Sequence, residues 1–245
     1  MARLKGPSVT VAYQTILERI LSFALLPGDT VSDNALAQEL DMSRTPVREA
    51  MQRLVYEGLV KSAGTKWVVA PLTLDDVAEI CQVRETLESK AVELILRKGG
   101  LTQDQLAYLR QLNQGMREAI SRQDYESNFE FDDRFHNEIM INSQNSRLIQ
   151  LFNCLRLQIL RARWLTVYRC AYPYEQSLRD HEALIDALER MNLGQARFCV
   201  EKHLATAEEN FSQAFSASND SMALKALHLL NADQIKKKES RETAP

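Results

Sequence analysis

Histidine is scarce in this sequence, and three of its four histidines stand where their side chains could act together. Asp132 and His136 are four residues apart in a stretch with helical periodicity, so both side chains leave one helix face a turn apart. His181 and His203 lie beside core-type leucines in two later helical stretches. Three imidazoles and a carboxylate converging inside a bundle can bind a divalent metal, with room for water or another ligand. The alternative is that each histidine is an ordinary core or surface residue.

A second group of polar residues points to nucleic acid. Ser43 is a predicted N-cap, and the predicted helix that follows it ends at Gly58. The apolar residues of this helix recur at helical spacing: Val47, Ala50, Met51 and Leu54. The opposite, solvent-facing side carries four polar residues: Arg44, Thr45, Arg48 and Gln52. Arginine forks bind guanine edges or phosphates, and Thr and Gln are adaptable hydrogen-bond partners in a major groove. The alternative is a charged face that is merely solvated.

The elements around this basic helix decide between those two interpretations. A helix is predicted over Val11–Ala24 and a short second one over Asp33–Leu40. After the basic helix, the segments Leu59–Ser62 and Trp67–Val69 flank a turn at Gly64 and predict a β-hairpin. Helix, short helix, capped basic helix and hairpin together form a winged helix-turn-helix, which favours DNA binding.

The rest of the chain predicts an antiparallel all-α bundle of about six helices, so the fold class is mainly α. Thr102 to Gln105 has the pattern of a capping box, and Gly99 and Gly100 mark the helix end before it. The predicted helices are Leu74–Arg97, Thr102–Arg122, Asp124–Asn142, Ser146–Tyr168, Glu175–Met191 and Gly194–Phe215.

These patterns predict a DNA-binding domain over residues 1–72 and a helical effector domain over 73–218. Residues 219–245 are expected to form a mobile polar tail with one weak helix over 222–230, because such a segment buries little apolar surface.

Composition excludes several classes of protein. A hydrophobic fraction of 45% with 26% charged residues is that of a globular domain rather than a disordered chain. No apolar run approaches the roughly 20 residues that span a bilayer, and the first residues lack a secretory signal, so a cytoplasmic protein is expected. The four cysteines form no CxxC pair, which argues against a disulfide framework or a thiolate zinc site. The net charge of −3 argues against indiscriminate coating of nucleic acid, but it leaves operator binding open because a small basic surface on one domain suffices.

The N-terminal residues closely resemble those of GntR-type regulators. The resemblance covers about residues 8–71 and is carried by Pro27-Gly28-Asp29 and above all by the run Ser43-Arg44-Thr45-Pro46-Val47-Arg48-Glu49-Ala50. It implies that Arg44 and Arg48 read bases, that Ser43 and Thr45 bind phosphate or base, and that the wing enters the minor groove. This chain departs from some members in having Asn34 instead of Arg. It also has Ser62 to Thr65 at the wing tip, where many members have basic residues, so Lys61 and Lys66 are the remaining wing candidates.

The helical part resembles the FCD effector domain, the sensor half of one large GntR branch. The resemblance runs from about 74 to 215 and is carried by four segments: Arg84 to Glu88, Asp132 to His136, Asp180 to Leu188, and His203-Leu204. It implies a divalent ion, often zinc or nickel, held by the four residues Asp132, His136, His181 and His203. It also implies that Arg84 lines the effector pocket, where its fork could pair with a carboxylate. An ion pair between Arg84 and Glu88, one helical turn apart, is the alternative.

The leading hypothesis is a homodimeric, ligand-responsive regulator, expected to be a repressor, that binds a palindromic operator and a small organic acid. A sensor of the metal itself is one alternative. A metal-dependent hydrolase or oxygenase fused to a DNA-binding domain is another, since such a metal site could activate water. No second carboxylate is clearly placed as a general base, because Asp133 is turned about 100° around the helix from Asp132. We therefore do not expect an enzyme.

Overall fold

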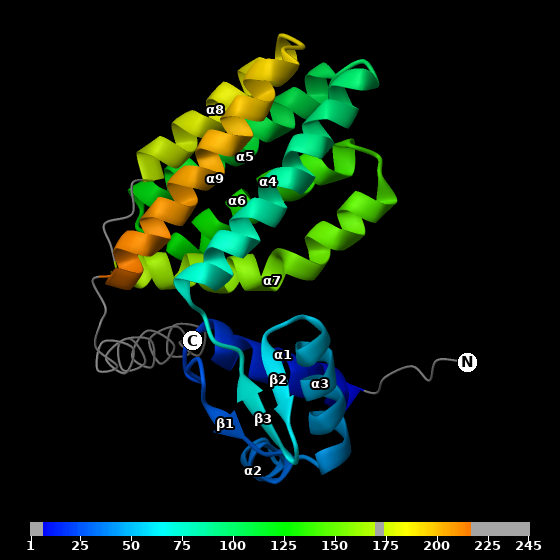
Figure 1. Cartoon of the computed structure of the whole chain (residues 1–245), viewed down its shortest axis with the longest axis vertical. Coiled ribbons are helices and arrows are strands. Elements are labelled where there is room, and N and C mark those ends of the chain that lie inside the picture. Colours follow the sequence, from blue (N-terminus) through cyan, green and yellow to red (C-terminus); the bar gives the residue numbers. More distant parts are fainter. Residues whose placement is uncertain (1–6, 170–173, 217–245) are drawn as a thin grey trace, which may run out of the picture. The chain divides into compact units, whose positions relative to one another are not determined.

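The computed structural model describes residues 7–169 and 174–216 of the 245-residue chain (Figure 1). The chain forms two compact units and passes from the first to the second between Thr73 and Leu74. A winged helix is followed by a helical bundle, so the predicted fold class is confirmed. The tail predicted over 219–245, including its weak helix, lies outside the described residues.

The N-terminal unit combines helices with a small antiparallel sheet. Its elements are α1 (Pro7–Leu21), β1 (Thr30–Val31), α2 (Asp33–Glu39), α3 (Arg44–Tyr56), β2 (Val60–Ala63) and β3 (Lys66–Val69). β2 and β3 form the predicted hairpin, which turns at Gly64 with a positive φ of 64° that glycine adopts freely. β1 pairs with the other edge of β3 and places Val31 opposite Trp67. The sequence did not predict β1, because a strand of two residues carries no periodicity.

Helices α1 and α3 build the core of this unit. The apolar stripe of α3 predicted from its spacing is fully buried, and so are four residues of the first helical segment: Ala12, Ile16, Ile20 and Phe23. At the far end of α3 the Tyr13 hydroxyl donates to Glu57 Oε2 at 2.8 Å, and the Arg53 guanidinium lies 3.7 Å from the centre of the Tyr13 ring. These contacts fix one face of α3 and leave its polar face exposed.

The second unit is the predicted bundle, and six helices lie within its described residues: α4 (Leu74–Arg97), α5 (Gln103–Ser121), α6 (Tyr125–Asn142), α7 (Ser146–Arg169), α8 (Tyr174–Glu189) and α9 (Leu193–Ser216). Helix α6 packs against α4, α5 and α7, and α5 also packs against α8 (Figure 1). Side chains from all these helices contribute to one apolar core, with Leu109, Phe135 and Ile185 fully buried. This packing of α6 buries three of its polar residues, Asn128, Asp132 and His136.

Local signals set the ends of the helices. Thr102 Oγ1 accepts from the Gln105 amide at 3.2 Å, and Gln105 Oε1 accepts from the Thr102 amide at 2.8 Å, so the capping box predicted from the sequence is confirmed. Gly99 and Gly100 both adopt positive φ values just beyond the end of α4. The connection between α4 and α5 is therefore short and well defined.

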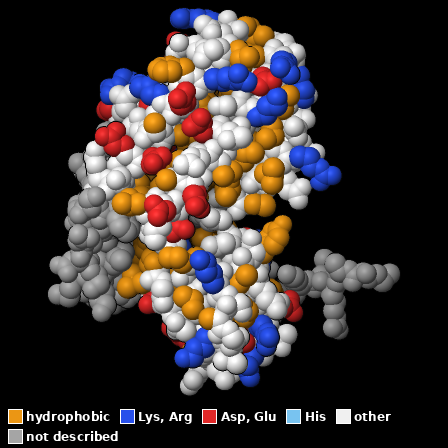
Figure 2. Space-filling model, in the orientation of Figure 1, with side chains coloured by type: hydrophobic (Ala, Val, Ile, Leu, Met, Phe, Trp, Pro, Cys, Tyr) orange, Lys and Arg blue, Asp and Glu red, His pale blue; other side chains and the backbone are white. Residues whose placement is uncertain are grey.

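The face of the molecule shown in Figure 2 carries no large field of a single sign over its described residues. On the face that Figure 2 presents, positive, negative and apolar side chains are intermixed over the bundle, in keeping with the small net charge of −3. None of the described helices combines the length and the apolar composition that crossing a membrane requires.

Candidate metal centre and DNA-reading helix

The bundle brings together the four residues that the sequence proposed as metal ligands. Asp132 and His136 come from α6, His181 from α8 and His203 from α9. One potential ligand atom from each residue lies within 4.8 Å of the others, and all four residues are buried. Helical spacing places the first two side chains on one face of α6, and the packing of α8 and α9 supplies the other two.

The three imidazole rings are mutual neighbours. Their centroids are separated by 5.2 Å between His136 and His181, by 5.1 Å between His136 and His203, and by 4.7 Å between His181 and His203. The Phe135 ring stacks on His181, with the centroids 4.2 Å apart and the planes 19° from parallel. Phe135 is fully buried, so it limits the rotation of the His181 ring.

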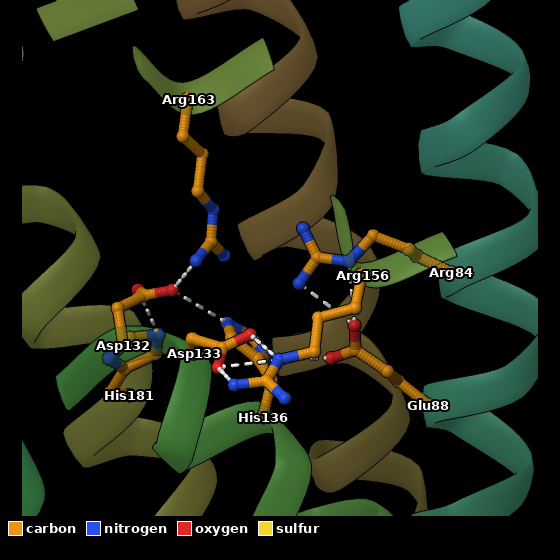
Figure 3. Close-up of polar contacts among 8 residues, drawn as sticks. All are labelled: Arg84, Glu88, Asp132, Asp133, His136, Arg156, Arg163 and His181. Carbon is orange, nitrogen blue, oxygen red and sulfur yellow. Dashed lines mark hydrogen bonds and ion pairs between the residues drawn. The ribbon is translucent and has the colours of Figure 1, made fainter. Parts of the chain in front are cut away.

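Several nitrogens in this cluster are buried without hydrogen bonds. Among the described residues, neither nitrogen of His181 has a hydrogen-bond partner, and neither does Nε2 of His136. Asp132 Oδ2 lies 3.7 Å from His136 Nε2, and Asp132 Oδ1 lies 3.7 Å from His181 Nε2, too far for hydrogen bonds (Figure 3). Burying polar nitrogens in this way is costly unless something else binds them. The donor set of imidazole nitrogen and carboxylate oxygen therefore fits a divalent transition-metal ion.

The electrostatics of the cluster favour the neutral forms of His181 and His203. Burial lowers the pKa of His181 well below its ordinary value, and the His136, Arg163 and Arg84 charges lower it further. Burial also lowers the pKa of His203 well below its ordinary value, with smaller contributions from His181, His136 and Arg84. Only the neutral imidazole offers a lone pair to a metal, so the environment selects the binding form.

Glu88 on α4 is a member of the site that the sequence analysis missed in this role. It accepts a hydrogen bond from His136 Nδ1 at 2.8 Å, which leaves Nε2 of that ring directed at the cluster (Figure 3). Although burial opposes ionisation of Glu88, the Arg84 guanidinium and the His136 imidazole hold its pKa far below the ordinary range. The signal that could have identified it was an acidic residue within the apolar face of α4. Carboxylates of this kind orient metal-binding histidines and fix their tautomer.

Arg84 makes the ion pair that the sequence left as an alternative. Its Nε donates to Glu88 Oε1 at 2.9 Å, and both side chains are almost completely buried. The guanidinium therefore stabilises the carboxylate that holds His136. This contact does not exclude a bound carboxylate, because a guanidinium carries five N–H donors.

Two arginines of α7 extend the polar network, and the sequence analysis proposed neither. Arg163 forms an ion pair with Asp132 (Figure 3). Arg156 donates through Nε to both carboxylate oxygens of Asp133, at 2.9 and 2.8 Å. Asp133 is thus engaged with α7 and is not presented to the histidines. Arg163 and Asp132 also line a hollow together with Asn128, Tyr174 and Ser177.

The predicted DNA-reading residues lie on the exposed face of α3. Arg44, Thr45, Arg48 and Gln52 line one shallow groove together with Asp33 and Glu49. Ser43 occupies the N-cap position as predicted, but its side chain makes no capping hydrogen bond and is exposed. Lys61 and Lys66 are both exposed on the wing, in β2 and β3. The structure therefore presents all seven proposed DNA contacts to solvent within one unit.

Comparisons with known proteins identify both parts of the chain. The family model described as bacterial regulatory proteins, gntR family, matches residues 9–66, and the FCD domain model matches residues 79–206. The chain belongs to the GntR family and carries an FCD domain. It is a DNA-binding transcription regulator, and its relatives and matching families are those of regulators, not enzymes.

Individual relatives support this assignment over most of the chain. The Nta operon transcriptional regulator of Aminobacter aminovorans is 27% identical over 220 residues, which cover 89% of this chain and 98% of that protein. The gluconate operon transcriptional repressor of Bacillus licheniformis is 31% identical over 179 residues, which cover 69% of this chain and 71% of that protein. The solved structure of E. coli McbR/YncC has a TM-score of 0.69 at 24% identity, covers 87% of this chain and all of that one, and shows the same fold.

Replacing Arg48 by Ala should weaken binding to a specific operator without unfolding the protein, because Arg48 is exposed and outside the core. Loss of one bidentate base contact costs about 1–3 kcal/mol per half-site. Gel-shift titrations with a duplex selected by the wild-type chain from a randomised pool would measure the effect. Arg190→Ala, just beyond the end of α8 at a side chain that is 77% exposed, is the matched control and should bind as wild type. If both variants bind the operator with wild-type affinity, Arg48 does not contribute to the DNA interface.

The metal-free protein should lose stability as the pH falls below about 6.5. His181 and His203 have lowered pKa values in the folded state, whereas in the unfolded chain they titrate near 6.5, so protonation favours unfolding. The free energy of unfolding should decrease between pH 7 and 5.5 by up to about 2.5 kcal/mol, the value for two histidines that stay neutral throughout in the folded state. Urea unfolding in chelator across this range measures it. A His181→Gln/His203→Gln variant should show a flatter profile, and an equal slope in both proteins would contradict the assignment.

Proposed function

We propose that this protein is a homodimeric, metal-dependent repressor that releases a palindromic operator when a small organic acid binds inside its helical domain. Residues 1–72 bind DNA through Ser43, Arg44, Thr45, Arg48, Gln52 and the wing lysines Lys61 and Lys66. Residues 73–218 hold a divalent ion and the acid. Because bacterial DNA lies in the cytoplasm, the protein acts there.

The observation that carries this proposal is the buried cluster of Asp132, His136, His181 and His203 with its unpartnered nitrogens. Three neutral imidazoles and one carboxylate are donors that zinc or nickel accepts. Four protein donors do not fill the coordination sphere of an ion that takes six ligands, so the metal would supply Lewis-acid binding of the acid's carboxylate and hydroxyl oxygens.

The chain's own residues prepare this site. Glu88 holds His136 through Nδ1 and thereby directs Nε2 toward the other ligands. Arg84 stabilises Glu88, and Arg163 pairs with Asp132 beside the hollow that Asn128 and Ser177 also line. The guanidinium charges of Arg84 and Arg163 are balanced by Glu88 and Asp132, so the divalent ion would supply the net positive charge that attracts an anion. An arginine fork also matches a carboxylate. Beside the metal ion, the site is therefore suited to a small acid rather than to a neutral ligand.

Binding in this cluster can change the packing of the bundle. The four ligands come from α6, α8 and α9, and the arginines and Glu88 come from α4 and α7. A ligand that binds one arrangement of these helices more tightly shifts the population toward that arrangement. In a dimer, such a shift changes the spacing of two DNA readers and hence the fit to two half-sites.

The relatives support repression and an acidic effector. The Bacillus licheniformis protein is named as a repressor of a gluconate operon, that is, of genes for the metabolism of a sugar acid. A sensor of the metal itself is the second candidate, favoured by the same donor cluster. Operator binding that responds to added metal without any organic acid would support the metal sensor instead.

Native mass spectrometry of freshly purified protein tests assembly and metal together. The expected species has twice the 28.0 kDa chain mass and carries one divalent ion per chain. Mass shifts identify zinc or nickel, and a co-purified acid would add its own mass. A chelator-treated sample is the control and should lose the ion. A monomer, or a dimer that never takes up zinc or nickel, would contradict the corresponding part of the proposal.

His203→Ala should lose the metal and the response to effector while it keeps operator binding in the effector-free state, because His203 is a ligand distant in sequence from the DNA reader. Glu88→Gln should weaken metal binding by about 10- to 100-fold, because it perturbs the partner of His136 and also removes the charge that pairs with Arg84. Metal titration monitored by calorimetry, followed by gel shifts with added sugar acids, measures both effects. Release of DNA by His203→Ala at wild-type effector concentrations would show that the cluster is not the sensor.

A further inference from the structure

A buried carboxylate lies next to the DNA-reading face of α3. Asp33, the first residue of α2, is only 6% exposed. Its Oδ1 accepts a hydrogen bond from the indole Nε1 of Trp67 at 2.5 Å, and its Oδ2 lies 3.9 Å from Nη2 of Arg44. One acidic side chain thus contacts both the wing and the first arginine of α3.

The surrounding backbone holds Asp33 in this place. Ser32 caps α2 by accepting from the Ala35 amide at 3.2 Å, which fixes the first turn that contains Asp33. β1 ends at Val31, directly before this cap, and Val31 is paired with Trp67 across the sheet. Trp67 itself is 8% exposed and cannot swing away without opening the sheet. The carboxylate is therefore oriented by the wing rather than by solvent.

The charges of the groove show why the position of the Asp33 carboxylate matters for DNA binding. Two carboxylates, Asp33 and Glu49, stand in the groove with the two guanidiniums of Arg44 and Arg48. A carboxylate on a DNA-binding surface repels phosphate and so opposes sequence-independent binding, which depends on net positive charge. The Arg44 side chain is 63% exposed, and ordering a long exposed side chain at an interface costs conformational entropy unless the free protein already restricts it.

We propose that Asp33 is a positioning residue for sequence reading: held by Trp67, it keeps the Arg44 guanidinium over the groove and disfavours contacts with phosphate alone. Asp33 thereby raises the ratio of operator affinity to non-specific affinity and makes this ratio depend on the wing. The inference rests on the proposed role of Arg44 in reading bases.

The test compares two DNA probes under the same salt: a duplex that the wild-type full-length chain selects from a randomised pool, and a shuffled duplex of the same length and composition. Asp33→Asn keeps an oxygen that can accept from Trp67 and removes only the charge. The ratio of the two affinities should fall at least about fivefold, the lower limit for losing one bidentate base contact, and the affinity for the shuffled duplex should not fall. Fluorescence anisotropy measures both affinities.

Asp41→Asn is the matched control. Asp41 is exposed in the turn between α2 and α3, and its positive φ of 50° is one that Asn tolerates. It removes the same charge from the same unit, so both affinities should change by one common factor and their ratio should stay at the wild-type value. A simple effect of net charge would lower the ratio equally in both variants and would overturn the proposal.

Two further variants separate positioning from folding. Trp67→Phe removes the indole N–H that donates to Asp33 and should also lower the ratio of operator affinity to shuffled-duplex affinity. This variant tests the proposal if Asp33→Asn fails to fold. Asp33→Asn combined with Arg44→Ala should lower the ratio by less than the two single losses added together as free energies, because Asp33 acts largely through Arg44. Additive losses, or an unchanged ratio in well-folded Asp33→Asn, would refute positioning. A wild-type ratio in Arg44→Ala would instead refute base reading by Arg44 itself.

Discussion

The helical domain is organised around the burial of three imidazoles and a carboxylate among its helices. Polar groups without partners destabilise a core, so such a cluster persists only if its surroundings and its ligand offset the cost. The apolar core of the bundle offsets part of this cost through residues such as Phe135, which stacks on His181. In the metal-bound form that we propose, the cation would offset the rest of the cost, and the stability of this domain would then depend on its ligand.

Charge compensation in the cluster follows from that constraint. Glu88 is buried as an anion because Arg84 and His136 both contact it. Asp132 is likewise compensated by Arg163 from a different helix. The same buried environment that lowers the pKa of His181 and His203 strengthens these ion pairs, so neutral imidazoles lie beside the ionised carboxylate of Glu88. Both forms are the ones that coordinate metals.

The DNA-binding unit uses a related arrangement at its surface. Helix α3 has one face buried against α1 and secured by Tyr13, Arg53 and Glu57, which frees the opposite face for DNA. A buried carboxylate, Asp33, then adjoins an exposed arginine, as Glu88 adjoins a histidine in the bundle. In both places a residue that contacts no ligand restricts one that does, which reduces the ordering cost of binding.

The sequence by itself determined what depends on neighbouring residues. Helical spacing identified the buried stripe of α3 and the shared face of Asp132 and His136, and the capping box marked the start of α5, because each relation lies within one or two helical turns. The run from Ser43 to Ala50 was specific enough to indicate the family before any fold was known.

Only the tertiary structure decided the contacts between elements. Glu88 reaches His136 across 48 residues and Asp33 reaches Trp67 across 34, and β1 exists only because β3 offers it an edge. The convergence of His181 and His203 on α6 and the pairing of Arg163 with Asp132 likewise depend on how each helix is rotated about its axis when it packs. Periodicity defines which face of a helix is apolar, but the packing of whole surfaces selects the partner that this face meets.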